Sequence, residues 1–151
     1  MPDIGFKTSV GSVYAASTDQ PNPSRRLRVE ESIEQGTYPT GEAIAEPMAV
    51  RFDTNGKVVK ASAAAAGTAD VKGIGLARRP GANYGLTVLK QGVLEGFDLS
   101  SLAFGAAVYL SDTPGRLSTA AGTVSVIVGY VEPIHNNLNG GTPGKVLRVK
   151  L

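Results

Sequence analysis

Residues 107–118 read AVYLSDTPGRLS and residues 49–60 read AVRFDTNGKVVK, so the chain contains one strand–turn–strand phrase twice. In each copy an apolar strand leads into an Asp/Thr turn that Gly closes, and a basic residue then begins a second strand. The likeness continues downstream, where residues 67–77 (GTADVKGIGLA) and 122–131 (GTVSVIVGYV) each place Gly-Thr before a strand with an internal Gly. The repeated phrase contains no reactive motif, so the duplication indicates an architectural protein.

The composition favours short strands over long helices. The chain has 151 residues, about the length of one domain, and includes 19 Gly and 9 Pro. Long helices tolerate neither residue well, whereas tight turns between strands use both. Hydrophobic residues make up 42% of the chain, which argues against disorder throughout.

Charge and cysteine content exclude several classes of function. There is no Cys, which excludes disulfide frameworks, thiolate catalysis and Cys-ligated metal sites. The formal net charge of +2 is too small to predict a nucleic-acid partner. No apolar run approaches the ~20 residues of a membrane-spanning helix. We therefore expect a soluble protein that binds neither nucleic acid nor membrane.

The pattern of strands and turns predicts an all-β fold. Asn55-Gly56 is a strong hairpin signal and predicts a type I′ turn, since Asn and Gly accept positive φ. Gly73 and Gly75 interrupt a short strand and indicate a bulge or a close backbone contact. Residues 84–89 and 91–97 are candidates for two separate strands, and residues 145–151 for the last one. Strands at this spacing predict a small barrel or sandwich.

Residues 1–40 differ from the rest of the chain, so we expect two parts: an extended N-terminal arm over 1–40 and a β-rich domain over 41–151. The first part contains a breaker cluster at 19–24 (DQPNPS) and a mixed-charge stretch at 25–31 (RRLRVEE). Its apolar residues are sparse and lack sustained periodicity. The segment is expected to be a flexible tail or an arm that becomes ordered only against a partner.

No candidate catalytic, cofactor-binding or metal-binding residue stands out. His135 is the only histidine, which excludes a multi-histidine metal site and leaves a His-based triad without support. The GGTPGK sequence at 140–145 lacks the leading Gly and the Ser/Thr of a phosphate-binding loop. A Ser/Lys pair such as Ser111 and Lys90 is the least implausible catalytic combination, although nothing in its spacing singles it out. We therefore predict a protein that is not an enzyme and needs no cofactor.

The second copy of the phrase carries a family resemblance. Residues 102–118 (LAFGAAVYLSDTPGRLS), followed by Val-Gly-Tyr-Val at 128–131, resemble the capsid decoration, or cement, proteins of tailed bacteriophages. Those proteins tend to show a Gly, a Val-Tyr strand, an Asp/Gly turn and then a strand with Gly before a closing apolar pair. Ala106 departs from the pattern, because an Asp often follows the Gly at that place. The resemblance covers roughly residues 42–151.

The resemblance implies a fold, a partner and a location. It implies a compact β-barrel or β-tulip body, commonly a homotrimer on the exterior of the phage head. It also implies an N-terminal arm that lies on neighbouring subunits of the major capsid protein. The expected function is capsid stabilisation in the virion, after assembly in the host cytoplasm. The alternatives are another virion module (a head-fibre base, or a tail or host-surface binding domain) and, further off, a self-cleaving Ser/Lys peptidase.

Arg25, Arg26 and Arg28 are the candidate partner-binding residues. Guanidinium groups pair with carboxylates in a bidentate manner, so this cluster would suit acidic patches on the capsid. The competing interpretation is a solvated charge cluster that Glu30, Glu31 and Glu34 neutralise. The sequence leaves both interpretations open.

Overall fold

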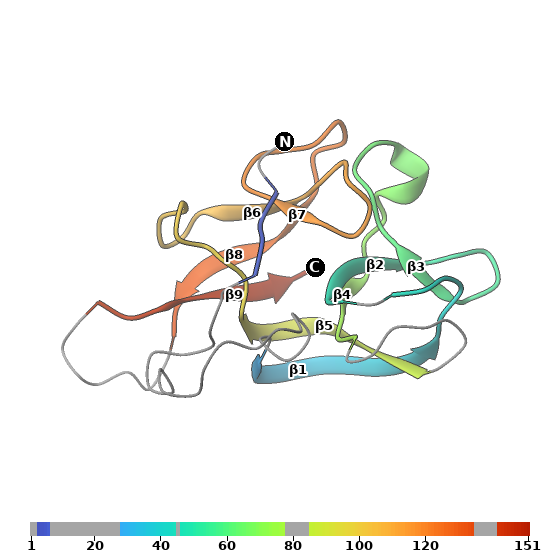
Figure 1. Ribbon diagram of the computed structural model, residues 1–151, viewed down its shortest axis with the longest axis horizontal. Helices are drawn as coiled ribbons and strands as arrows, with labels where there is room; N and C mark the ends of the chain where they lie inside the picture. The colour runs from blue at the N-terminus through green and yellow to red at the C-terminus, as the bar shows by residue number, and fades with distance from the viewer. Residues whose placement is uncertain (1–2, 7–27, 45, 78–84, 135–141) are drawn as a thin grey trace.

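The structure confirms the all-β prediction. The computed structural model describes residues 3–6, 28–44, 46–77, 85–134 and 142–151. Its antiparallel sheet curls strongly and forms a half-barrel (Figure 1). The strands are β1 (Arg28–Pro39), β2 (Met48–Phe52), β3 (Val58–Lys60), β4 (Gly73–Gly75), β5 (Gly85–Glu95), β6 (Ala107–Leu110), β7 (Leu117–Ser118), β8 (Ile127–Pro133) and β9 (Lys145–Lys150), and a short 3-10 helix, η2 (Ala66–Thr68), follows β3.

The strand order shows that the duplication extends beyond the repeated phrase. The sheet runs β3-β2-β4-β5-β9-β8-β6-β7, while β1 pairs with β5 outside this path. Read inward from its two ends, the sheet has the order β3-β2-β4-β5 in one half and β7-β6-β8-β9 in the other. In each half, the second strand along the chain lies at the outer edge and is followed by the first, the third and the fourth. We call these halves copy one (β2–β5) and copy two (β6–β9). The copies meet where their fourth strands, β5 and β9, pair antiparallel.

One glycine occupies the same place in each copy. Gly73 lies opposite Val50 in the pairing of β2 with β4, and Gly129 lies opposite Val108 in the pairing of β6 with β8. A Cβ added to Gly73 would lie 2.5 Å from the carbonyl oxygen of Leu89, and one added to Gly129 would lie 2.0 Å from that of Arg148. The predicted close backbone contact is therefore confirmed at Gly73 and recurs at Gly129.

Backbone hydrogen bonds at the tip of the second hairpin join the two copies. The Gly115 N–H donates to the Ala61 carbonyl at 2.7 Å, and the Gly115 carbonyl accepts from the Ala49 N–H at 2.9 Å. Gly115 has φ +79°, and a Cβ there would lie 2.7 Å from the sulfur of Met48. Ala61 and Ala63 are fully buried beside this tip. Small side chains in the alanine-rich stretch at residues 61–66 (ASAAAA) thus allow the copies to approach closely.

The first hairpin forms as predicted, but its turn lies one residue earlier than a type I′ turn over Asn55-Gly56 requires. The Gly56 N–H donates to the Asp53 carbonyl at 3.1 Å, which places Thr54 and Asn55 at the centre of the turn. The Asp53 carboxylate accepts the N–H groups of Asn55 and Lys57 at 2.8 and 2.9 Å. Gly56 then takes φ +77°, the conformation that glycine adopts at low cost.

The turn at Ala106 forms without an Asp side chain at that position. The Ala106 N–H donates to the Ala103 carbonyl at 3.1 Å, and the Ala106 carbonyl accepts from the Val131 N–H at 2.9 Å. Gly105, with φ +86°, donates its N–H to the Val131 carbonyl at 2.8 Å. Main-chain groups therefore provide hydrogen bonds for this turn.

One further expectation, the break between two strands near residue 90, differs from the structure. Residues 84–89 and 91–97 were expected as separate strands, whereas β5 runs continuously from Gly85 to Glu95. Residues 28–39, inside the predicted arm of 1–40, form β1 and pair with β5 along its whole length (Figure 1). Residues 7–27 of that arm lie outside the described residues, and the division at residue 40 stays a prediction.

Short backbone bridges cover the strands at both ends of the sheet. Thr40 bridges to Val58 of β3, and the Gly41 N–H donates to the Val58 carbonyl at 2.9 Å. Asp3 bridges to Ser118 of β7, and the Ile4 N–H donates to the Leu117 carbonyl at 2.8 Å. Such coverage protects sheet edges from pairing with other chains.

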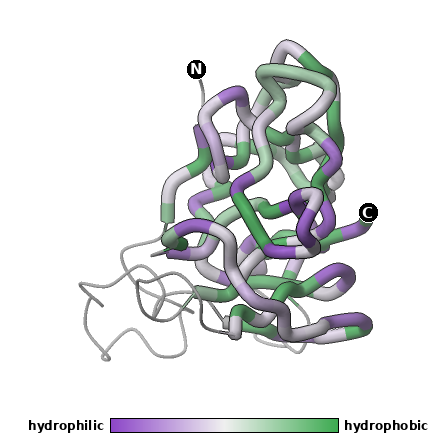
Figure 2. Tube along the Cα trace, turned by 90° about the vertical axis from the view of Figure 1, so that its right-hand side faces the viewer, coloured by the Kyte–Doolittle hydropathy of each residue, from purple (hydrophilic) through white to green (hydrophobic). Residues whose placement is uncertain are grey.

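The core combines side chains from both copies with one from the N-terminal segment. The hydropathy colouring of Figure 2 changes repeatedly between apolar and polar along the trace, as expected of strands with one buried face. Ile4 is 3% exposed and belongs to the main core cluster, and Phe6 stacks on Phe97 with ring centroids 5.3 Å apart. A smaller cluster forms around Ile44, Val50, Val58, Ala77, Leu86 and Val88.

Gly129→Ala tests the close strand contact. The added methyl group would overlap the Arg148 carbonyl, so we expect a loss of about 2–3 kcal/mol in the free energy of unfolding, measured by urea denaturation. Gly73→Ala should behave alike. Gly67→Ala is the matched control, because nothing lies within 4 Å of its added Cβ. Equal stability of Gly129→Ala and the unaltered protein would contradict the described packing.

Candidate interaction surface

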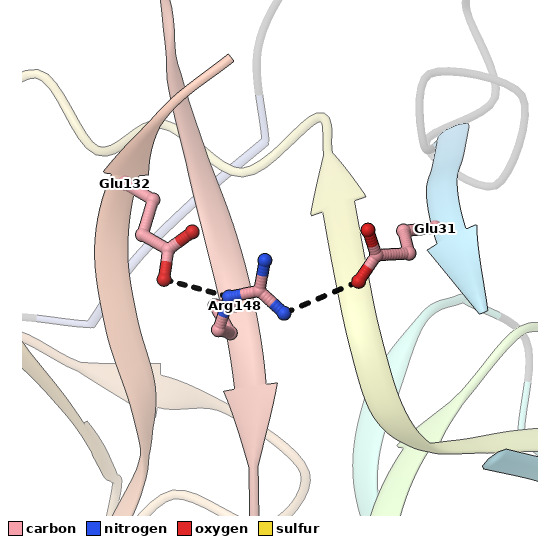
Figure 3. A network of polar contacts seen from close by, with 3 residues as sticks. All are labelled: Glu31, Glu132 and Arg148. Carbon is pink, nitrogen blue, oxygen red and sulfur yellow. Dashed lines mark hydrogen bonds and ion pairs between the residues drawn. The ribbon is translucent and has the colours of Figure 1, made fainter. Parts of the chain in front are cut away.

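Strand β1 is attached to the body by a charged side chain that reaches across β5. The Arg148 Nε of β9 donates to Glu132 of β8 at 2.6 Å, and its Nη1 donates to Glu31 of β1 at 3.3 Å. Figure 3 shows the guanidinium group between the two carboxylates, with β5 passing between β9 and β1. The hydrogen bond with Glu132, assisted by that with Glu31, raises the pKa of Arg148 above its ordinary value. This guanidinium therefore stays charged at any physiological pH.

A second basic side chain attaches β1 further along β5. The Lys90 ammonium lies over the ring of Tyr38, 5.1 Å from its centroid. It also lies 3.9 Å from a carboxylate oxygen of Glu34. The interaction with the Tyr38 side chain outweighs desolvation and raises the pKa of Lys90. Arg148 and Lys90 both have long side chains that reach β1 from other strands. They therefore hold β1 in place without burying it.

The middle of β1 is exposed to solvent. Ile33 is 60% exposed and Val29 is 38% exposed, although both are large apolar residues. Among the described residues β1 pairs only with β5, and the pairing shifts register at three places between Val29 and Gln35. These irregularities bend a strand and limit sheet extension along it. We call β1, with its exposed residues and its free edge, the β1 surface.

The predicted partner-binding arginines lie at the start of this surface or before it. Arg28 is the first residue of β1, where its backbone pairs with Glu95, and its side chain lies outside the described part of the structure. Arg25 and Arg26 lie outside the described residues. Their role in binding stays a prediction.

Two of the three carboxylates that were expected to neutralise the arginine cluster, Glu31 and Glu34, have basic partners on other strands. Glu31 pairs with Arg148 of β9, and Glu34 pairs with Lys90 of β5. These two ion pairs could not be predicted from the sequence, because the partners in each pair are far apart along the chain.

Ser111 and Lys90, the candidate catalytic pair, are not in contact. Ser111 is fully buried, and its hydroxyl group donates to the Asp3 carboxylate and accepts from the Thr113 N–H. The Lys90 ammonium lies beside Tyr38 and Glu34 instead. His135 lies outside the described residues. The described part of the chain also holds no group of three or more His, Asp or Glu side chains placed to bind a metal ion.

Comparison of the sequence with protein-family models and with curated proteins finds no relative. No protein-family model and no curated protein sequence matches the chain at a significant level. In the part of the chain that the structure describes, no helix has the length and apolar character needed to cross a membrane.

Arg148→Met tests the attachment of β1. The substitution keeps an unbranched side chain but removes both ion pairs, so the amides of residues 31–34 should exchange hydrogen about fivefold faster, an effect of about 1 kcal/mol. Residue-resolved hydrogen exchange measures it. Lys150→Met, an exposed position on the same strand, is the control and should leave β1 unchanged. Unaltered exchange in Arg148→Met would show that the ion pairs do not hold β1.

Proposed function

We propose that this protein is a capsid decoration protein of a tailed bacteriophage. In this proposal it binds the outer surface of the head and stabilises the capsid by bridging neighbouring subunits of the major capsid protein. Its partners are the capsid protein and two further copies of itself in a homotrimer. The proposal starts from the sequence resemblance over residues 102–118 and 128–131.

The proposal is supported above all by the structural role of the residues that show the resemblance. Gly105 closes the turn before β6, Gly115 forms the tip of the second hairpin, and Gly129 allows β8 to approach β9. The Asp112 carboxylate accepts hydrogen bonds from the N–H and the hydroxyl group of Thr123, both at 2.8 Å. The resembling residues are thus the ones that shape copy two, which supports a shared fold and, through it, a shared role.

The physical demands of capsid stabilisation suit this architecture. Packaged DNA presses outward on the shell, and a clamp that spans several subunits resists their separation through many weak contacts. In this proposal the half-barrel acts as the clamp, while the β1 surface offers exposed apolar and charged groups to a partner. An N-terminal segment that orders on binding would extend the contact over a wide area.

Binding to capsids tests the proposal. Purified protein should co-sediment with expanded capsids assembled from the major capsid protein encoded with this chain, and should raise the temperature at which they fall apart. Bovine serum albumin at the same concentration is the control for trapping. Failure to co-sediment, together with unchanged thermal resistance, would contradict the proposal.

Neutralising the arginines tests their assigned role. Arg25→Gln with Arg26→Gln should weaken capsid binding about tenfold, because bidentate pairs with acidic capsid groups are lost, and adding Arg28→Gln should weaken it further. Lys57→Gln with Lys60→Gln removes the same charge from the first hairpin and should leave binding within twofold. Equal binding by both double variants would contradict a role for the arginines. Substitution suits this test better than truncation at residue 30, because Ile4 is part of the core.

A further inference from the structure

The two hairpins of the duplication differ at one position of chemical importance. Residues 53–57 read DTNGK in copy one, and residues 112–116 read DTPGR in copy two. Asn55 therefore stands where copy two has Pro114, and Gly follows each of them. An Asn-Gly pair is open to a reaction between its side chain and the main chain, because glycine places no side chain beside the reacting nitrogen. A Pro-Gly pair has no side-chain amide and cannot react in this way.

The tip of the first hairpin is open to solvent, unlike that of the second. Residues 54–57 are all exposed, and a Cβ added to Gly56 would have nothing within 4 Å. Gly115, by contrast, is buried, and its main-chain groups bond to copy one. Water and hydroxide ion therefore reach the tip that contains the Asn-Gly pair.

The groups that would react are lightly restrained. The side-chain amide of Asn55 makes no hydrogen bond with any described residue, although its main-chain N–H donates to the Asp53 carboxylate at 2.8 Å. The attacking group is the Gly56 nitrogen, whose N–H donates to the Asp53 carbonyl at 3.1 Å. Opening one hydrogen bond in an exposed turn costs little free energy, since water replaces the lost partner. A small local opening thus brings the nitrogen to the side chain.

We propose that Asn55 is a site of spontaneous modification through a succinimide. The Gly56 nitrogen gives up its proton and bonds to Cγ of Asn55, the bond from Cγ to the side-chain nitrogen breaks, and that nitrogen leaves as ammonia. Water then adds to one of the two carbonyl carbons of the ring, whose bond to the ring nitrogen breaks. The product at position 55 is aspartate or isoaspartate, according to the carbonyl that water attacks. The reaction needs no partner, so it does not depend on the proposed function.

The modification would loosen the hairpin between β2 and β3. One carboxylate oxygen of Asp53 accepts the main-chain N–H groups of Asn55 and Lys57, at 2.8 and 2.9 Å. Isoaspartate lengthens the main chain by one atom between these two donors, so both no longer fit the same oxygen. Either product also adds a negative charge close to Asp53, which repels its carboxylate. We expect the Lys57 amide to lose its hydrogen bond.

Incubation of the intact protein at mildly alkaline pH tests the proposal. Trypsin cleaves after Arg51 and Lys57, so the peptide 52–57 (FDTNGK) contains Asn55 and no other asparagine. This peptide should be converted to two products of equal mass, one with aspartate and one with isoaspartate, which chromatography separates. The rate in the folded protein should lie within about tenfold of the rate in a synthetic peptide of the same sequence, because exposed turns open at little cost.

Two variants serve as controls. Asn55→Gln keeps a side-chain amide, but its extra methylene group makes ring formation far slower, so the peptide should stay unmodified. Asn55→Asp, freshly prepared, reproduces the added charge without the longer main chain. Hydrogen exchange at the Lys57 amide should become about tenfold faster in the isoaspartate form and should change less in Asn55→Asp. Asn139, which also precedes a Gly, falls in a different tryptic peptide.

Three results would overturn the proposal. The first is a folded protein that stays unmodified while the synthetic peptide is fully converted, which would show that the turn protects Asn55. The second is conversion to aspartate alone, which would indicate direct hydrolysis without a ring. The third is equally fast conversion of Asn55→Gln. Unchanged hydrogen exchange at Lys57 in the isoaspartate form would contradict the expected effect on the hairpin.

Discussion

Strand β5 pairs with β9 through four residue pairs, and this contact joins the two copies into one sheet. Leu94 and Leu147, which face each other there, are both fully buried, so the contact lies within the core. Each copy alone would be an open four-stranded sheet with an uncovered apolar face. β5 also carries β1. The body and the β1 surface therefore share one strand.

The sequence predicts this fold where the copies resemble each other and fails where they do not. The hairpins of both phrases and the close contact at Gly73 follow from residues a few positions apart. The equivalence of β5 and β9 does not follow from nearby residues. The sequences GLTVLK at 85–90 and GKVLRV at 144–149 share little, and only the register in which each strand pairs with its neighbour shows that the two have the same role. Strand β1 lacks alternation because its middle is exposed on both faces, and its partner β5 lies more than forty residues away.

The β1 surface is less predictable for the same reason. A cluster of arginines or an Asn-Gly pair is visible in any sequence, but a contact between distant strands forms only when folding brings them together. Lys90 lies over Tyr38, and nothing in its local sequence distinguishes it from Lys57 or Lys60. Nothing in the local sequence around Arg148 indicates that its side chain lies between Glu132 and Glu31, as it does in the structure.

A duplicated β body with the exposed β1 surface suits the proposed role, in which the protein holds other subunits together. The most direct measurement is electron cryo-microscopy of expanded capsids incubated with the purified protein. The account predicts three-lobed density on the outer surface at three-fold or quasi-three-fold positions, each lobe fitted by the half-barrel and in contact with more than one capsid subunit. Capsids without added density, or density confined to the tail of intact virions, would contradict it.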